Sequence, residues 1–206
     1  MLTKIRFFIV LMLIAGTGGW LSSPVFAQTT GGELTQFYVW NDGEQDRKVW
    51  LSPNLLAEFN TSGAARSPTA ALSLAPATRI AKRGAIALWR LDEGASVSET
   101  LTQIQAAAPT RSFSPVLHDG PSTSGRMRAL PGNVILMLNP VWGEAEINQW
   151  IAEQGLTVVK KLNFGKNILV LQTPPGLASL RIANSLADLP GVAAAFPNWW
   201  VEVSLR

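Results

Sequence analysis

The chain has 206 residues, with 17 Lys and Arg against 14 Asp and Glu, one His and no Cys. The absence of Cys excludes a disulfide framework and a lipid-modified Cys anchor, so the stability of the fold has to come from packing. Two of the basic residues, Lys4 and Arg6, lie at the start, which leaves 15 basic and 14 acidic residues after residue 27. Because that remainder is close to neutral and has no Lys/Arg stripe with interleaved aromatic residues, we expect no nucleic-acid partner.

The first 27 residues have the pattern of a secretory signal peptide. Lys4 and Arg6 precede the apolar run from Phe7 to Ala15, and Val25-Phe-Ala27 is a small-residue cleavage pattern before Gln28. A membrane anchor is the weaker alternative, because the uninterrupted apolar run is shorter than the ~20 residues that span a bilayer. We therefore expect a secreted or periplasmic protein without membrane contact after signal cleavage.

Residues 28–125 are predicted to form an N-terminal region that begins with a β-hairpin. Its strands are Phe37–Trp40 and Lys48–Leu51, joined through Asn41-Asp-Gly43, residue types that tolerate left-handed turn conformations. Leu55–Phe59 fits a further strand. The stretch Thr61–Thr78, rich in Ser, Ala, Pro and Thr, reads as a weak helix or an ordered loop.

The rest of this region alternates between strands and a helix. We expect a strand at Gly84–Leu91, a helix at Ser96–Ala108 that opens with a capping box, and a strand at Ser112–Leu117. Asp119–Gly125 is then a turn or short linker, and Arg126–Leu130 is a candidate partner for the preceding strand.

Residues 126–198 read as a complete folding unit. Their apolar periodicity and stop residues predict six elements: the strand Asn133–Leu138, the helix Glu144–Gln154, the strands Leu156–Leu162 and Asn167–Thr173, the helix Leu177–Leu189 and the strand Val192–Phe196. This βαββαβ order predicts an α+β, ferredoxin-like sandwich, an antiparallel sheet with two helices on one face.

Two further features concern how this unit is completed. Its strands are apolar at consecutive positions, as in Val134–Leu138, so both faces of the sheet carry aliphatic side chains and the face without helices needs a cover. Either the N-terminal half of the chain or a partner protein provides it. The strand, Gly turn and helix from Ile86 match those from Ile168, so the N-terminal half is also predicted to be a degenerate, related α/β half.

No pattern of catalytic residues emerges. The only histidine, His118, lies beside Asp119 in a turn-like segment, where a solvated His is the simplest interpretation. There is no Gly-x-Ser-x-Gly elbow, phosphate-binding loop or dinucleotide fingerprint, and the soft ligands of a zinc site are missing. We expect a protein that is not an enzyme, with no catalytic residues, no cofactor and no metal.

Several short motifs of the C-terminal half carry a family resemblance. They are Gly155-Leu-Thr-Val-Val159, the strand Asn167–Thr173 followed by Pro174-Pro175-Gly176, and above all Leu189-Pro-Gly-Val192 followed by Phe196-Pro-Asn198. This succession resembles the N-terminal prodomain of subtilisin-like serine proteases, particularly the fervidolysin-like type. The resemblance covers Leu130 to Trp200 well and Phe37 to Leu130 more loosely, as an additional propeptide-like region.

The printed sequence ends at Arg206, so we expect a protein that differs from such zymogens in lacking a catalytic domain. The resemblance therefore implies a free-standing propeptide, a secreted or periplasmic chaperone or inhibitor that binds a subtilisin-like serine protease in trans. It also implies that the open sheet face docks on the protease and that the tail, residues 199–206, enters the substrate cleft. The alternative is a non-inhibitory structural or surface-assembly module that reuses the fold.

The tail and the residue before it have strand periodicity with one largely apolar side, as expected of a segment that adds to an exposed sheet edge. The competing interpretation is that this segment prolongs the last strand and helps to fold its own domain. The predicted protease-binding residues are Asn198, Trp199, Trp200, Val201, Glu202, Val203, Ser204, Leu205 and Arg206.

Overall fold

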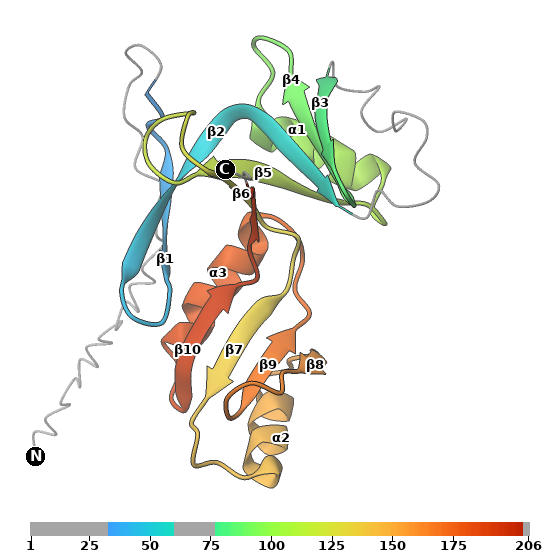
Figure 1. Cartoon of the computed structure of the whole chain (residues 1–206). Coiled ribbons are helices and arrows are strands. Elements are labelled where there is room, and N and C mark those ends of the chain that lie inside the picture. Colours follow the sequence, from blue (N-terminus) through green and yellow to red (C-terminus); the bar gives the residue numbers. More distant parts are fainter. Residues whose placement is uncertain (1–32, 60–76, 204–206) are drawn as a thin grey trace, which may run out of the picture.

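The computed structural model describes residues 33–59 and 77–203, and in these ranges the chain forms three helices and 11 strands (Figure 1). The strands make two sheets, one of seven strands and one of four, and neighbouring strands are antiparallel. The predicted α+β class is confirmed. The proposed signal peptide and most of the stretch predicted as a weak helix or loop lie outside the described residues.

The seven-stranded sheet is built mainly from the N-terminal half. Its strands run in the order β11-β6-β5-β2-β4-β3, and β1 pairs with β2 beside this series. The bounds are β1 (Phe37–Asn41), β2 (Asp46–Phe59), β3 (Ala77–Arg83), β4 (Ile86–Leu91), β5 (Ser112–His118), β6 (Met127–Ala129) and β11 (Trp200–Val201). The predicted hairpin is confirmed as β1 and β2, and the expected pairing of β5 with β6 also forms.

Two strands of this sheet differ from the prediction. Leu55–Phe59 is not a separate strand, because β2 continues through an irregularity between Leu51 and Leu56. The segment Ser52-Pro53-Asn54 looks like a turn in sequence, but here it is the bulged part of one long strand. Strand β3 was missed, since its Thr, Arg and Lys side chains give no apolar alternation.

Helix α1 (Val97–Ala107) covers one face of this sheet, as predicted from its apolar stripe. Ser96 caps it by accepting a hydrogen bond from the Glu99 amide at 3.4 Å. Its Ile104 is 1% exposed and packs in a cluster with Trp89 and Phe113 of the sheet.

The four-stranded sheet contains the elements predicted for the C-terminal unit. Strands β7 (Val134–Leu138), β8 (Val158–Lys161), β9 (Ile168–Leu171) and β10 (Val192–Pro197) lie in the order β10-β7-β9-β8, with the helices α2 (Glu144–Glu153) and α3 (Leu177–Ala187). Burial alternates along β7: Val134, Leu136 and Leu138 are fully buried, while Ile135 and Met137 are half-buried. Both helices contribute to the cluster around the buried residues, so they cover the same face.

The two sheets share one strand order. Numbered within each set, β5-β2-β4-β3 and β10-β7-β9-β8 both read fourth, first, third, second, and a helix links the third strand to the fourth in each. Residues 60–76, which correspond in sequence to α2, lie outside the described residues. The common order supports the predicted relationship between the two halves.

A third cluster joins the two units. Trp40 and Val49 of the hairpin pack with Leu117 and Leu130 from the first sheet and with Leu180 of α3. The hairpin lies along α3 and β10 (Figure 1). There the Asn184 side-chain amide donates to the Val39 carbonyl oxygen at 2.9 Å. Because these residues come from both halves of the chain, the halves share a core.

Candidate functional site

The tail that was predicted to bind a protease is partly built into the chain's own fold. Strand β11 pairs with β6, with Trp200 opposite Ala129 and Val201 opposite Arg128. The Glu202 amide continues the pairing by donating to the Met127 carbonyl oxygen at 2.9 Å. This arrangement agrees with the competing interpretation in that the segment takes part in the chain's own fold, but β11 does not prolong β10, because it joins the other sheet through β6. Ser204–Arg206 lie outside the described residues.

Trp199 anchors the segment through aromatic contacts. Its ring meets the ring of Trp40 edge to face, and the guanidinium carbon of Arg128 lies 5.7 Å from the Trp199 ring centroid and 5.8 Å from that of Trp40. A cation at this distance is attracted to the ring faces. Sequence reasoning missed this cluster, because its members are far apart in the chain.

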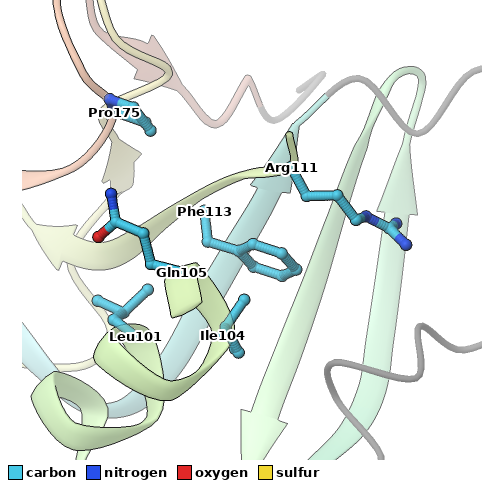
Figure 2. A pocket seen from close by; sticks show the side chains of 6 residues that line it. All are labelled: Leu101, Ile104, Gln105, Arg111, Phe113 and Pro175. Carbon is cyan, nitrogen blue, oxygen red and sulfur yellow. The ribbon is translucent and has the colours of Figure 1, made fainter. Parts of the chain in front are cut away.

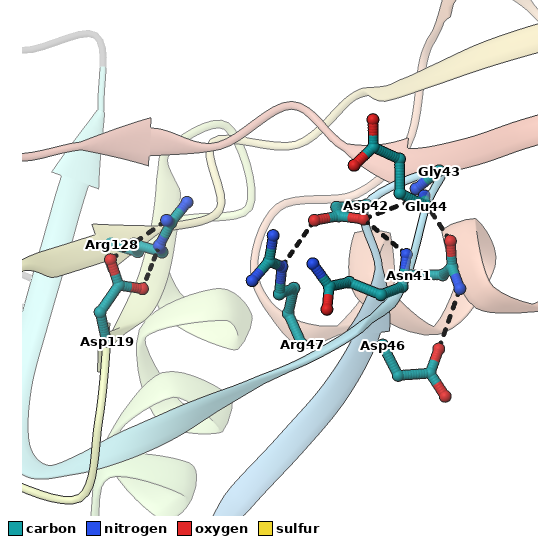
Figure 3. A network of polar contacts seen from close by, with 9 residues as sticks. Asn41, Asp42, Gly43, Glu44, Asp46, Arg47, Asp119 and Arg128 are labelled. Carbon is teal, nitrogen blue, oxygen red and sulfur yellow. Dashed lines mark hydrogen bonds and ion pairs between the residues drawn. The ribbon is translucent and has the colours of Figure 1, made fainter.

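Asp119 holds Arg128 in place (Figure 3). Arg128 Nε donates to Asp119 Oδ1 at 2.5 Å, and Arg126 Nε donates to Oδ2 at 3.0 Å. Burial raises the pKa of Asp119, but the hydrogen bonds and positive charges of Arg128 and then Arg126 outweigh this effect, so the pKa lies below its ordinary value. The carboxylate therefore acts as the fixed counter-charge of this cluster.

His118 is not the solvated loop residue that was expected. It is the last residue of β5, is 1% exposed, and its Nδ1 lies 3.0 Å from the Gly125 carbonyl oxygen. Its Nε2 is buried without a hydrogen-bond partner among the described residues, and Asp119 is bonded to arginines instead. The arrangement around His118 is thus that of a packed structural histidine.

The face of the four-stranded sheet opposite α2 and α3 is apolar and more open. Ile135 pairs with Val170, and Met137 pairs with Ile168 and with Ala194 on its other side. The β1–β2 hairpin covers part of this face at β10, where Phe196 packs in the cluster of Trp40. Ile168 and Val170 of β9 are also buried. Ile135 and Met137 remain half-buried, which gives a surface suited to protein contact.

A groove of about 470 Å³ lies where the two units meet. One bank is α1, the other is formed by the amino end of α3 and by β1, and the floor includes Leu51, Phe113 and Pro115. Figure 2 shows a small adjoining hollow, with the Gln105 amide on the side of Pro175 and Arg111 directed away from it. No local sequence pattern predicts this groove, because tertiary packing alone brings α1 and α3 together.

Within residues 33–59 and 77–203, no three His, Asp or Glu residues gather closely enough to hold a metal ion. The same residues contain no helix that is long and apolar enough to cross a membrane. Comparison with protein-family models, curated proteins and solved structures finds no match to this chain.

Proposed function

We propose that this is a secreted or periplasmic propeptide-like protein that binds a subtilisin-like serine protease in trans, as a folding chaperone, an inhibitor or both. In this proposal residues 126–198 are a ferredoxin-like prodomain. The observation that carries it is the β10-β7-β9-β8 order, with both helices on one face and an apolar opposite face. The motifs that resemble the prodomain family lie in these same elements.

The open sheet face is the proposed docking surface. Ile135 and Met137 lie at its centre. Covering half-buried aliphatic side chains of this kind with a partner lowers the free energy of the complex. Docking through Ile135 and Met137 requires no strand of the sheet to separate, because both side chains are already partly exposed.

The tail is the proposed second contact, and its use requires a change. Residues 199–201 would have to leave β6 to enter a cleft as an added strand. The Nε1 atoms of Trp40 and Trp199 are buried without a hydrogen-bond acceptor among the described residues. Such burial costs about 1–3 kcal/mol for each group. The packing of the tail on its own sheet is therefore less stable than its other contacts suggest.

The alternative, a non-inhibitory structural or surface-assembly module, is favoured by one observation. The tail segment fills a place in the chain's own sheet and core, as expected of a segment that completes a fold. In this alternative the sheet face binds a structural partner instead of a protease.

Inhibition assays distinguish a protease-binding protein from a structural module. The purified protein is expected to inhibit a subtilisin-type protease but neither trypsin nor chymotrypsin, because the docking surface would fit the subtilase fold and not only a cleft. Met137→Asp should weaken inhibition at least about tenfold, since a charge on the apolar face opposes its desolvation. Ala145→Asp, on the exposed side of α2, is the matched control and should leave inhibition unchanged.

A chaperone role needs its own assay. A subtilase that lacks its propeptide should give more active enzyme when co-expressed with this protein than when expressed alone. Absence of both effects, or equal inhibition of both protease folds, would count against the proposal and favour the structural module.

A further inference from the structure

The groove between α1 and α3 has the size and the lining of a binding site. Its volume of about 470 Å³ falls within the range of roughly 300–1,000 Å³ that is typical of ligand sites. Val97, Leu101 and Gln105 of α1 line it at four-residue spacing, which places them on one face of the helix. At a rise of about 1.5 Å per residue, this bank is roughly 12 Å long.

The groove carries one charge, and that charge is positive. Arg181 of α3 is the only ionised residue of the lining, and it has no acidic partner among the described residues. Tyr38 lies on the same bank, and its hydroxyl accepts a hydrogen bond from Gln36 Nε2 at 2.8 Å, which leaves its own proton to be donated. A negatively charged group that accepts hydrogen bonds could therefore bind to Arg181 and to the Tyr38 hydroxyl.

The charge of Arg181 affects the pKa of Tyr38. Burial raises the pKa of Tyr38, and the hydrogen bond from Gln36 and the positive charge of Arg181 offset this only in part. The Tyr38 hydroxyl therefore keeps its proton at neutral pH and can donate it. The bond from Asn184 to the Val39 carbonyl oxygen fixes β1 against α3, and so holds Tyr38 close to the helix that carries Arg181.

The rest of the lining favours a peptide over a simple acyl chain. Leu51, Phe113 and Pro115 offer an apolar floor, and Gln105 of the α1 bank also lines the groove, without a hydrogen-bond partner among the described residues. An acyl chain would desolvate the Gln105 amide and give it no hydrogen bond, at a cost of about 1–3 kcal/mol. A peptide backbone supplies the N–H and C=O groups that the amide can bond.

We propose that this groove binds the carboxyl-terminal end of a short peptide. Arg181 and the Tyr38 hydroxyl hold the terminal carboxylate, the apolar floor takes the last side chain, and Gln105 bonds to the backbone. At about 3.3 Å per extended residue, the α1 bank spans three or four residues of such a peptide. This binding does not depend on the proposed protease partner.

Titration calorimetry with the purified protein tests the proposal. The probe is the tetrapeptide acetyl-Ala-Ala-Ala-Leu with a free carboxylate, compared with the same peptide as its carboxamide and with octanoate. The carboxamide and octanoate should each bind at least about tenfold more weakly, because the first lacks the charge and the second lacks the backbone amides.

Variants locate the site. Arg181→Gln should reduce affinity for the carboxylate peptide about tenfold, to the level of the carboxamide. Arg90→Gln is the matched control, since Arg90 is an exposed arginine of β4 outside the groove. The proposal is overturned if millimolar carboxylate peptide shows no saturable binding, if the carboxamide or octanoate binds equally well, or if Arg181→Gln has no effect. No protease is present, so these outcomes do not depend on protease inhibition.

Discussion

The indole rings of Trp40 and Trp199 meet edge to face, with their centroids 5.3 Å apart and an interplanar angle of 61°. One ring comes from the first hairpin and the other from the segment after the last long strand. The contact therefore joins the two ends of the described chain within the core that both units share. A C-terminal segment with this role contributes to folding, whatever it binds.

Replacing Trp199 with Ala should lower the free energy of unfolding by about 3 kcal/mol, the lower end for a large aromatic residue because Trp199 is half-buried. Urea unfolding followed by circular dichroism measures the change. Val203→Ala is the control, since Val203 is 77% exposed and should shift the stability by less than about 0.5 kcal/mol. Equal stability of the two variants would show that the segment does not support the fold.

The pair of Glu58 and Arg111 gives a second prediction. Glu58 is 1% exposed, accepts from Trp89 Nε1 at 3.0 Å and forms an ion pair with Arg111. Arg111→Met removes the cation and leaves a buried carboxylate uncompensated, so we expect a loss of about 3–5 kcal/mol. Arg126→Met, at an arginine whose side chain is 57% exposed, should cost less than about 1 kcal/mol in the same unfolding assay.

Local signals in the sequence predicted most elements of the fold, and tertiary interactions explain the exceptions. The helix over residues 97–107 follows from its apolar stripe and its Ser96 cap, both readable within a few residues. Strand β3 could not be read in this way, because Thr78, Arg79 and Lys82 are exposed and its pairing with β4 defines it.

The candidate sites also differ in whether local sequence predicts them. The open sheet face was predictable, because consecutive apolar residues in β7 require two covered faces. The groove and the Trp40–Trp199 contact were not, since each brings together residues more than 75 positions apart. Only the packing of the two units creates them.

The shared core predicts that the two units unfold together. Leu180 is 2% exposed and packs against residues from both halves of the chain. Leu180→Ala should cost about 2–5 kcal/mol and shift one cooperative transition, seen identically by tryptophan fluorescence and far-UV circular dichroism. Limited proteolysis should likewise not release two stable fragments by cleavage near Gly125. Two separate transitions, or such fragments, would mean that the units fold independently.

The lowered pKa of Asp119 predicts that the stability of the protein depends on pH. The folded pKa of Asp119 lies below the ordinary 3.8, so Asp119 contributes stability above that value, and the contribution disappears as the pH falls through the folded pKa. Asp119→Asn should therefore be less stable than the original protein at pH 7, and the difference should shrink below about pH 4. Urea unfolding across this range measures it, and a difference that stays constant with pH would contradict the assignment.

The conformation and the surroundings of Gly191 explain why a glycine occupies the Leu189–Val192 turn. Its φ is +86°, and an added Cβ would lie 2.0 Å from a ring carbon of Trp142. Gly94 provides a matched control, because it has the same φ of +86° and open space where its Cβ would be. Gly94→Ala should therefore cost only the backbone strain, about 1–2 kcal/mol.

Gly191→Ala should cost more than Gly94→Ala by at least about 1–3 kcal/mol, because Trp142 has to move within the cluster that joins α2 to the sheet. Unfolding of the two variants in urea gives the difference directly, since the backbone term is common to both. Near-equal stabilities would mean that Trp142 yields without cost and that the turn needs glycine for its φ alone. A larger loss in Gly191→Ala would show that close packing of the turn on Trp142 fixes the residue at this position.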